Sequence, residues 1–390
     1  MTILYVLNST DPLGGATKSF IALLKGITLA GAKAIVVVPD ANGIYKTLRD
    51  MNVEVIIQKE KGNTWTGAKT LKQTFLYIPR QIGRLLINLH AQHSLEKKLE
   101  GIDFNIVHSN VSIVSLGKSI AEKRRLPHIY HIREYGDKDF GLTYFPTNAS
   151  FHHYLTGKNV YSICITKDIQ RHHGLADISS SKVIYNGIID NIGMTTLRVG
   201  GGDFFLYAGR IEPTKGLLKL VKAYRQYVVK TPDALPLKVA GEVIDLSYLH
   251  AITDYIVQYQ LEKHIMFLGR ISDMPTLYRQ AKAIIIPSEH EGFGRCMPEA
   301  MSYGCITIAH NTGGSKEQLD NGLALTGKEI GFRYNDTEEL TEQLITLHNL
   351  KSNEMTDMRQ RAYQCVCELY SCKTYVESVL DFYHYITNKE

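Results

Sequence analysis

The sequence is short of the features that mark unusual protein classes. Its 390 residues include only six cysteines, too few for a disulfide framework and without the paired CxxC spacing of metal sites. No apolar run approaches the roughly 18–20 residues that a membrane span needs. The short apolar start, residues 1–7, lacks the basic region of a signal peptide. With 44% hydrophobic and 21% charged residues, the composition predicts a cytoplasmic globular protein of two domains.

A strong excess of either charge is also missing. Residues 1–190 hold 23 Lys and Arg against 15 Asp and Glu, and residues 191–390 hold 21 against 24, which gives the net charge of +5. This surplus is too weak and too spread for a dedicated nucleic-acid-binding protein. It favours a first half that meets an anionic ligand or surface.

Short apolar runs alternate with helical patterns along the whole chain, which predicts parallel, doubly wound sheets. The alternation stops at 189–202, a glycine-rich stretch expected to be a hinge, and then restarts. We therefore predict one domain at 1–187 and a second at 188–374, with the carboxyl ends of both sets of strands facing a central cleft. Strands are expected near 1–7, 34–38, 53–57, 106–108, 129–131 and 162–166, and then near 204–209, 237–241, 265–269 and 283–287.

The most specific segment follows the buried strand at 283–286. Glu291 lies in a glycine-containing loop, and Glu299 lies in the first turn of a helix expected to start near Pro298. Backbone N–H groups of such a loop and helix start bind anions, and carboxylates accept hydrogen bonds from hydroxyls. This combination suits a nucleotide sugar. The alternative is a plain strand–turn–helix unit in which Glu299 only favours the helix dipole.

Two further motifs follow predicted strands. Arg210 ends the strand at 204–209, and Lys215 lies in the turn before the next helix, where two cations could hold a diphosphate. The alternative is two solvated surface cations. Gly14 and Gly15 follow the first strand and would allow a phosphate close to the backbone, although a Gly-Gly pair is most often just a turn.

Taken together, these motifs resemble the family 4 glycosyltransferases, which are retaining enzymes of GT-B fold that use nucleotide sugars. The resemblance covers nearly the whole chain. One stretch, 318–332, is longer than the usual family pattern and is expected to form a surface loop. The resemblance rests on Gly209-Arg210 with Lys215-Gly216, Glu291-Gly292-Phe293-Gly294 with Glu299-Ala300-Met301, Val183–Ile188, and Thr312-Gly313-Gly314 with Glu317.

The resemblance implies a role for each motif. Arg210 and Lys215 would bind the donor diphosphate, Glu299 the ribose, and Glu291 hydroxyls of the transferred sugar. The leaving phosphate would take the acceptor proton on the same face, since no side chain stands out as a general base. Further donor-binding positions are implied at Gly14, Gly15, Gly209, Arg270, Ile271, Phe293 and Gly294.

The first domain is expected to supply the acceptor side. His131 resembles the strand histidine that meets the donor sugar, although a lone histidine is more often a satisfied structural one. Asp137-Lys138-Asp139 looks like the metal signature of the other glycosyltransferase fold, but it lies in a polar loop and is expected to be solvated charge. The GT-B fold needs no metal, so no metal or cofactor is expected. By the same resemblance, a helix at 375–390 is expected to cross back to this domain.

Residues 69–98 form a basic amphipathic pattern. Apolar residues follow helical spacing and most cations lie off that stripe, which is typical of a helix on an anionic membrane. An apolar stripe packed on the core of the domain is an equal alternative, and Pro79 is expected to bend or interrupt the helix. The stripe is Leu71, Phe75, Ile78, Ile82, Leu85, Leu86 and Leu89, and the cations are Lys69, Lys72, Arg80, Arg84, Lys97 and Lys98.

The sequence therefore predicts a retaining hexosyltransferase that acts in cell-surface polysaccharide or lipid-linked glycan assembly. Its partners would be a nucleoside-diphosphate sugar, a glycan or lipid-linked acceptor and the inner membrane face, with no nucleic acid. Two alternatives remain. A sugar-nucleotide epimerase of the same fold would need carboxylates placed for proton transfer at the sugar carbon. A non-catalytic nucleotide-sugar-binding protein should have lost some of the motif side chains.

Overall fold

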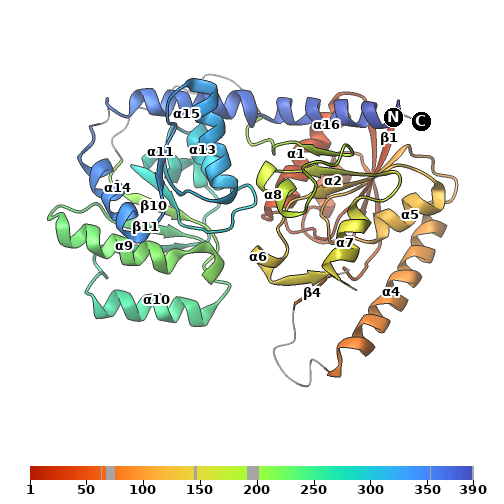
Figure 1. The fold of residues 1–390 in the computed structure, drawn as a ribbon, viewed down its shortest axis with the longest axis horizontal. Coiled ribbons are helices and arrows are strands. Elements are labelled where there is room, and N and C mark those ends of the chain that lie inside the picture. The colour runs from red at the N-terminus through yellow and green to blue at the C-terminus, as the bar shows by residue number, and fades with distance from the viewer. Residues whose placement is uncertain (63, 67–74, 145–146, 191–201, 352, 389–390) are drawn as a thin grey trace. The chain divides into compact units, whose positions relative to one another are not determined.

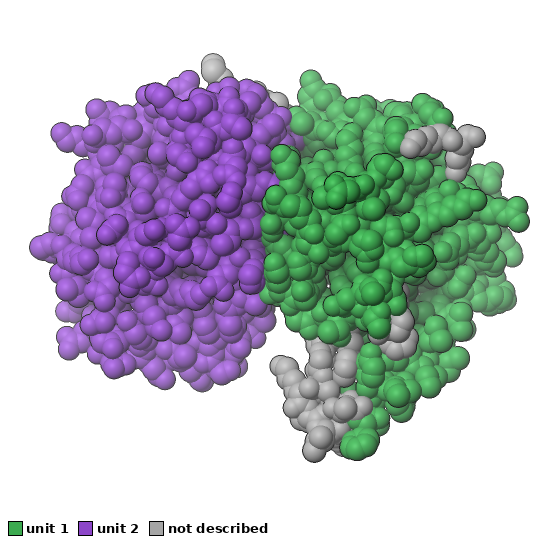
Figure 2. Space-filling model, in the orientation of Figure 1, with its two compact units in different colours: residues 1–187, 372–390 green, residues 188–371 purple. Residues whose placement is uncertain are grey.

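The computed structural model describes the whole chain except residues 63, 67–74, 145–146, 191–201, 352 and 389–390. The chain forms two compact units, coloured separately in Figure 2. Unit 1 comprises 1–187 together with 372–390, and unit 2 comprises 188–371. Most of the hinge expected at 189–202 lies outside the described residues.

Unit 1 is built on a seven-stranded parallel sheet with the order β3-β2-β1-β5-β6-β8-β9. The strands β5 and β6 are buried along their whole length, and β2 is buried over its Ile35–Val38 run of Ile and Val. A small antiparallel pair, β4 (Thr64–Thr66) with β7 (Leu142–Tyr144), lies apart from this sheet. The seven strands are β1 Thr2–Val6, β2 Lys33–Val38, β3 Glu54–Ile57, β5 Ile106–Ser109, β6 His128–Ile132, β8 Val160–Cys164 and β9 Ser181–Val183.

The helices of unit 1 include one from the far end of the sequence, α16, which packs against α1 (Figure 1). The contact is close because Gly26 of α1 has no side chain: a Cβ there would lie 2.2 Å from Val376. The helix expected from about residue 375 thus begins at Cys372. The helices are α1 Gly15–Leu29, α2 Tyr45–Asp50, α4 Tyr77–Lys98, α5 Leu116–Arg124, α6 Asp137–Phe140, α7 Asn148–Leu155, α8 Lys167–His172 and α16 Cys372–Thr387.

Unit 2 has a six-stranded parallel sheet with the order β12-β11-β10-β13-β14-β15. Its core lies between this sheet and amphipathic helices such as α9, whose apolar residues are buried. The strands are β10 Phe205–Ala208, β11 Leu237–Ala240, β12 Ile265–Gly269, β13 Ala283–Ile286, β14 Ile306–His310 and β15 Phe332–Tyr334. The helices are the 3-10 turn η1 Pro213–Lys215, α9 Leu217–Lys230, α10 Leu246–Gln258, α11 Met274–Gln280, α12 Cys296–Ser302, α13 Gly313–Thr326, α14 Thr337–Asn349 and α15 Thr356–Leu369.

One expectation from the sequence was wrong. The stretch after Glu317 is not a surface loop: α13 continues to Thr326, and Gln318 and Leu319 are buried in it. The Asn321-Gly322 pair looks like a turn, but Gly322 is there because Ile330 packs where its side chain would be, 2.2 Å from a Cβ.

The expected interruption of the helical pattern near Pro79 is confirmed. Phe75 is helical, Leu76 is a turn residue, and α4 starts at Tyr77. Pro79 falls in the first turn of α4, where the backbone N–H that proline lacks has no intrahelical partner.

The structure contradicts one of the two alternatives for the 69–98 stripe, packing on the core, as far as its residues are described. Residues 69–74 lie outside the described part. In α4 the stripe is exposed and does not pack on the core of unit 1. The buried residues of this helix are instead Gln81, Ala91 and Leu95.

Candidate functional site in each unit

The strand order of unit 2 reverses between β10 and β13, the position where doubly wound sheets bind their ligands. Lys215 lies in the turn after β10, and Glu291 lies in the loop after β13. The turn can approach the loop because Gly216 adopts a φ of +71° and its missing Cβ would lie 2.3 Å from the carbonyl oxygen of Pro287. Two motifs that are 76 residues apart in sequence therefore meet at the switch point.

Lys215 and Glu291 form a largely buried ion pair with 2.7 Å between Nζ and Oε1. Burial alone would favour the neutral form of both groups. For Glu291 the attraction of Lys215 outweighs burial and lowers the carboxyl pKa. For Lys215 the attraction of Glu291 outweighs burial and raises the ammonium pKa. Both side chains are therefore charged, and a ligand anion that binds Lys215 must compete with Glu291.

Two further charged residues of the predicted donor site are paired as well. Arg210 follows β10 and lies 2.8 Å from Glu212. Glu299 is in the first turn of α12 and accepts from Arg295, one turn earlier, at 3.2 Å. Arg210 is about half exposed, so its guanidinium is open to a ligand from solvent.

The start of α13 holds the Glu291 loop. The N–H of Gly314 donates to the carbonyl of Glu291 at 2.7 Å, and the Thr312 hydroxyl donates to the carbonyl of Glu289 at 2.7 Å. A Cβ on Gly314 would lie 2.7 Å from the carbonyl oxygen of Gly292, so only glycine allows this approach. The Gln318 amide also donates to the carbonyl of Phe293. The Thr312-Gly313-Gly314 motif thus fixes the loop that carries Glu291.

The remaining predicted positions of unit 2 lie at the same edge of the sheet. Gly209 follows β10. Gly294 has a φ of +71° in the loop before α12, and Phe293 is buried against the edge of the Tyr370 ring. Arg270 and Ile271 follow β12, the edge strand, which is two strands from the switch point. The Arg270 guanidinium lies 3.7 Å from Glu242.

Unit 1 has its own switch point, between β1 and β5. Gly14 and Gly15 follow β1, and α1 begins at Gly15 with no side-chain cap, so backbone N–H groups at its start are not satisfied by a capping side chain. Asn110 follows β5 and donates to the carbonyl of Ala16 at 3.4 Å. The two glycines therefore lie where a sheet of this kind admits a ligand.

His131 lies in β6 and is completely buried in a polar cluster beside this switch point. Its Nδ1 contacts the Nε2 of His108 at 3.2 Å and the guanidinium of Arg133 at 3.3 Å. A guanidinium only donates, so Nδ1 of His131 is the acceptor. Burial, together with the positive charge of Arg133, lowers the pKa of His131 well below its usual range, so the ring is neutral. A neutral ring with an accepting Nδ1 carries its proton on Nε2.

The other residues of the cluster form a chain of hydrogen bonds in which each group donates to the next, and His131 is its last member. Since Nδ1 of His131 accepts, His108 donates from Nε2 and accepts at its own Nδ1 from the Tyr383 hydroxyl, 2.6 Å away. Tyr383 in turn accepts from Tyr5 at 3.0 Å. The order of donors thus ends at the Nε2–H of His131, which has no hydrogen-bond partner among the described residues. A buried donor without a partner is costly, and a ligand oxygen would satisfy it.

Arg133 anchors the same cluster without a carboxylate counter-charge. Its guanidinium donates to five neutral acceptors, two of them on Asn110. The others are Nδ1 of His131, Oδ1 of Asn186 at 2.6 Å and the hydroxyl of Tyr375 at 3.2 Å. Asn110 directly follows β5, and His131 lies in β6. Asn186 lies at the end of residues 1–187, and Tyr375 lies in α16.

Sequence reasoning missed this cluster. His131 was singled out, but Arg133, two residues further on and directly after the end of the same strand, was not used. That spacing was the available signal. The other members lie far apart in sequence, and no local motif connects His108 with Tyr383.

In the Asp137-Lys138-Asp139 segment, Asp137 and Lys138 are exposed charges, as expected, but the segment forms the short helix α6 and not a loop. Asp139 accepts from the backbone N–H groups of Tyr135 and Gly136 at 3.0 and 2.7 Å, which fixes the start of α6. Asp137 lies 2.8 Å from Nε2 of His172. Over the described residues, no group of three or more His, Cys, Asp or Glu is arranged to hold a metal ion.

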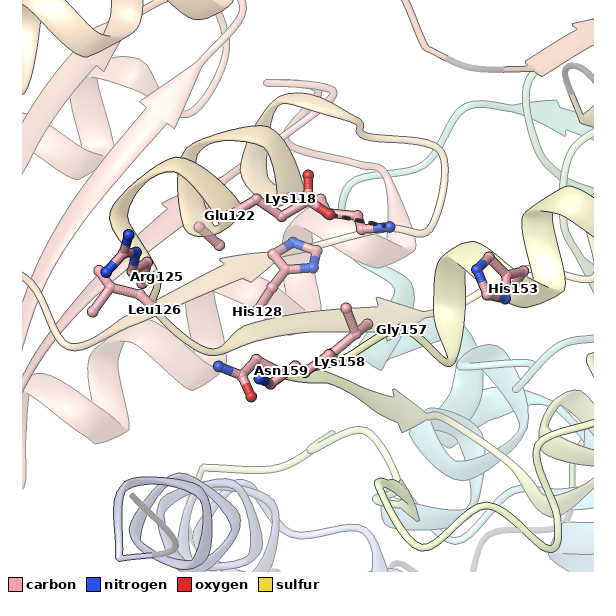
Figure 3. A pocket seen from close by; sticks show the side chains of 11 residues that line it. Lys118, Glu122, Arg125, Leu126, His128, His153, Gly157, Lys158 and Asn159 are labelled. Carbon is pink, nitrogen blue, oxygen red and sulfur yellow. Dashed lines mark ion pairs between the residues drawn. The ribbon is translucent and has the colours of Figure 1, made fainter.

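A separate cavity of about 630 Å³ lies in unit 1 and includes none of the predicted site residues (Figure 3). It is at the amino ends of β6 and β8, opposite to the edge where such sheets bind ligands. Lys118, at its wall, is already engaged by Glu122 at 3.5 Å and by the Tyr154 ring.

No helix in the described parts of the chain is long and apolar enough to cross a membrane.

Comparison with known proteins gives matches to glycosyltransferases. Residues 195–365 match the family described as "Glycosyl transferases group 1". A glycosyltransferase of Methanocaldococcus jannaschii is 28% identical over 64% of this chain. The O-antigen chain mannosyltransferase B of Escherichia coli is 31% identical over 33%. The chain spans just under two thirds (66%) of the first relative and about one third (34%) of the second.

Solved structures match over nearly the entire length. Anabaena HepE in complex with UDP has a TM-score of 0.75 at 20% identity, covering 98% of this chain and 99% of HepE. A glycosyltransferase from Rickettsia africae has a TM-score of 0.77 at 18% identity, covering 100% and 99%. These likenesses identify the fold, and the predicted GT-B class with two Rossmann-like units is confirmed.

Proposed function

From the match of residues 195–365 to the glycosyl transferases group 1, we propose that this chain moves a sugar from a nucleoside-diphosphate donor to a hydroxyl acceptor with retention of configuration. Unit 2 would bind the donor, and unit 1 would supply the acceptor side. Support for the donor class comes from Anabaena HepE, which was solved with UDP and with UDP-glucose. The relatives named mannosyltransferases support a hexose.

The observation that carries the proposal is the meeting of Lys215 and Glu291 at the switch point of unit 2. The diphosphate would replace Glu291 as the partner of Lys215, with Arg210 binding from the more exposed side. Glu291 would then be free to accept hydrogen bonds from hydroxyls of the transferred sugar. Glu299 would accept from the ribose. Two fixed cations would stabilise the negative charge that grows on the departing diphosphate.

His131 would act as a hydrogen-bond donor in this reaction. Its Nε2–H suits a sugar hydroxyl or phosphate oxygen, and its neutral ring with an accepting Nδ1 has no free lone pair to take a proton. This fits a mechanism in which the leaving phosphate removes the acceptor proton and the protein positions the reactants. No metal or cofactor is needed for that mechanism.

We also propose a cytoplasmic location with peripheral contact to an anionic membrane, and a role in cell-surface polysaccharide or lipid-linked glycan assembly. The basic surplus of the first half of the chain supports the contact. The O-antigen relatives support the role by their names. Each basic side chain near such a surface is worth about 1 kcal/mol at low salt and less as salt rises.

Product analysis with a panel of labelled UDP-, GDP- and ADP-sugars tests the proposal. Transfer of label to an acceptor supports it, an isomerised donor indicates an epimerase, and a bound but unchanged donor indicates a binding protein. Arg210→Ala with Lys215→Ala is the negative control and should abolish transfer. Equal turnover in this double variant and the wild type would remove the diphosphate assignment.

A further inference from the structure

The cavity of about 630 Å³ in unit 1 has walls with a surplus of positive charge (Figure 3). It is formed by α5 and the turn after it, the start of β6, and the turn between α7 and β8. Its volume falls within the range of about 300–1,000 Å³ that small-molecule sites have. Among its described lining residues, the cations Lys118, Arg125 and Lys158 face one carboxylate, Glu122. Such a cavity favours an anionic ligand.

Lys118 is the buried cation of this wall. Its side chain is 10% exposed, and its ammonium lies over the Tyr154 ring, 3.4 Å from the ring centroid. Its ion-pair partner Glu122 is 3.5 Å away on a side chain that is 65% exposed. A strong charge-assisted hydrogen bond measures about 2.7–2.9 Å, so Glu122 compensates the ammonium only in part. Burial accordingly lowers the pKa of Lys118 in spite of Glu122.

His128, at the start of β6, adds a buried polar ring to the same cavity. Figure 3 shows the ring between β6 and α5, among the lining side chains. Burial and the charge of the nearby Lys118 lower the pKa of His128 to about 3, so the ring is neutral and carries one proton. Its Nε2 lies 2.9 Å from the Ser109 hydroxyl, and its Nδ1 has no hydrogen-bond partner among the described residues.

The contact with Ser109 indicates which nitrogen of His128 carries the proton. If Nε2–H donated to the hydroxyl, the serine proton would lack an acceptor among the described residues, and Nδ1 would be a buried acceptor without a donor. If the hydroxyl donates to Nε2, the Nδ1–H is the one group left unsatisfied. Each unsatisfied buried group costs free energy, so the second arrangement is favoured. The cavity wall thus holds an N–H donor close to the ammonium of Lys118.

We propose that this cavity binds a small molecule with a phosphate monoester group, and that the phosphate contacts the ammonium of Lys118 and the Nδ1–H of His128. A phosphate monoester carries a charge of about −1.5 to −2 at pH 7, which matches a surplus of two cations. Arg125 and Lys158 are exposed at the cavity and add to the attraction. The cavity lies at the amino ends of β6 and β8, so it is a second ligand site, separate from the residues of the proposed sugar transfer.

The experiment is calorimetry on the full chain with inorganic phosphate and with glycerol 3-phosphate, without any nucleotide sugar. The test variant is Lys118→Gln. A second variant, Arg125→Asn with Lys158→Gln, changes exposed side chains alone, and asparagine tolerates the φ of +57° at residue 125. The matched control is Lys123→Gln, which removes a cation of α5 that does not line the cavity and pairs with Glu96 at 3.7 Å. Thermal unfolding without ligand checks the fold of each variant.

We expect glycerol 3-phosphate to bind the wild type and the control alike. Lys118→Gln should weaken its binding on the order of tenfold to a hundredfold, because a buried charged partner of the phosphate is lost. The exposed pair of substitutions should weaken it about two- to fivefold, and this variant also decides if Lys118→Gln fails to fold. Nitrogen-15 spectra should show His128 protonated at Nδ1, with a signal that shifts when inorganic phosphate is added.

Three results would overturn the proposal. One is the absence of heat with either phosphate compound. Another is equal affinity in the wild type, Lys118→Gln and the exposed pair of substitutions. The third is binding that Lys215→Ala abolishes and Lys118→Gln retains, because the phosphate would then occupy the proposed donor site of unit 2. The measurement uses no sugar donor, so failure of the proposed sugar transfer leaves its result unaffected.

Discussion

The polar centres of the two units satisfy their buried polar groups in different ways. In unit 2, charged side chains are neutralised in advance by one another, as Lys215 is by Glu291. In unit 1, the centre around His131 holds neutral rings and a guanidinium whose acceptors are all neutral. An ion-paired side chain such as Lys215 can exchange its protein partner for a charged ligand. The chain of neutral hydrogen bonds around His131 instead presents one N–H donor in one orientation.

The largest effect that separates the units is expected from acid. Burial lowers the pKa of His128 to about 3 and of His173 to about 4, and lowers those of His108 and His131 well below 6.5. The folded state stays neutral at these rings, whereas the unfolded chain binds protons below about pH 6.5. Each ring therefore removes about 1.4 kcal/mol of stability for every pH unit below that value, down to its folded pKa.

The buried carboxyls of Glu60 and Glu134 in unit 1 act in the opposite sense, because burial raises their pKa, that of Glu60 to about 7, and the folded state then binds a proton before the unfolded chain does. The four rings outnumber these two carboxyls, so unit 1 should still open before unit 2 as the pH falls from 7 to 5.5. Hydrogen exchange, corrected for the intrinsic effect of pH on amides, should accelerate in β5 and β6 and change little in β10 and β13. Equal acceleration in both sheets would contradict the contrast. The Lys215–Glu291 pair weakens only when Glu291 is protonated, and its lowered pKa puts that loss below the usual carboxyl range.

The next largest effect is expected from breaking the ion pair of unit 2. Lys215→Ala removes a cation aimed at the donor diphosphate and should cost about 2–4 kcal/mol of transition-state stabilisation. It also leaves Glu291 largely buried without its partner, so stability should fall. Steady-state turnover and urea unfolding measure the two losses.

Lys219→Ala is the matched control because Lys219 pairs with Glu289, and both of these side chains are about half exposed. An exposed pair is worth about 0–1 kcal/mol, so turnover and stability should change little. A second control, Lys215→Met with Glu291→Gln, should recover stability and not turnover. If Lys215→Ala and Lys219→Ala behave alike, the pair is not part of the reaction.

A smaller effect is expected in unit 1 from Tyr383→Phe. The variant removes the donor to Nδ1 of His108 and should cost about 1–3 kcal/mol of stability, since a buried acceptor loses its partner. It should also loosen the orientation of His131. Nitrogen-15 spectra of the histidine rings should show a single Nε2–H form of His131 in the wild type and a mixture in the variant.

Tyr385→Phe, on the exposed side of the same helix, is the control for this change and should leave both readouts unchanged. A wild-type His131 protonated at Nδ1 would show that the order of donors has been assigned in the wrong direction. Assignment of the ring signals can use His131→Gln, which removes one set of peaks.

An effect of similar size is expected to separate the roles of the two carboxylates of unit 2. Glu299→Gln should weaken binding of the bare nucleoside diphosphate by about 1.5–3 kcal/mol, because a hydrogen bond from the ribose to a charged group is lost. Glu291→Gln should leave that binding nearly intact and reduce turnover. Calorimetry with Glu289→Gln as a control on the same loop measures the difference. Equal losses in Glu299→Gln and Glu291→Gln would remove the division of roles.

The sequence predicted unit 2 better than unit 1 for a physical reason. Arg210, Lys215 and Glu291 each follow directly after a buried strand, so short motifs report their positions at the sheet edge. The cluster around Arg133 is assembled from segments more than two hundred residues apart, and no local pattern contains it. Helix α13 was missed because its Asn321-Gly322 pair has turn chemistry, and the packing of Ile330 that requires the glycine is not visible in sequence.

The stripe on α4 illustrates another limit. Periodicity identifies one apolar face of a helix, but it does not say whether that face turns inward or outward. Only the contacts of Asn88 and Arg84 on the opposite side give the direction. The same sequence pattern therefore fitted core packing and membrane contact equally well until the helix was seen in the fold.

The return of α16 into unit 1 has a consequence for how this protein is made. Tyr375, Val379, Tyr383 and Ile386 belong to the same buried cluster as Phe20 of α1. During translation, part of the apolar surface of α1 therefore stays exposed until residues 372–387 have left the ribosome. Most of unit 1 is synthesised before unit 2. Synthesis of unit 2 is nevertheless complete at Ser371, before the last segment of unit 1, residues 372–390, has been made. On the ribosome, unit 2 is thus the first that is able to complete its core, and unit 1 keeps an unfinished core in the meantime.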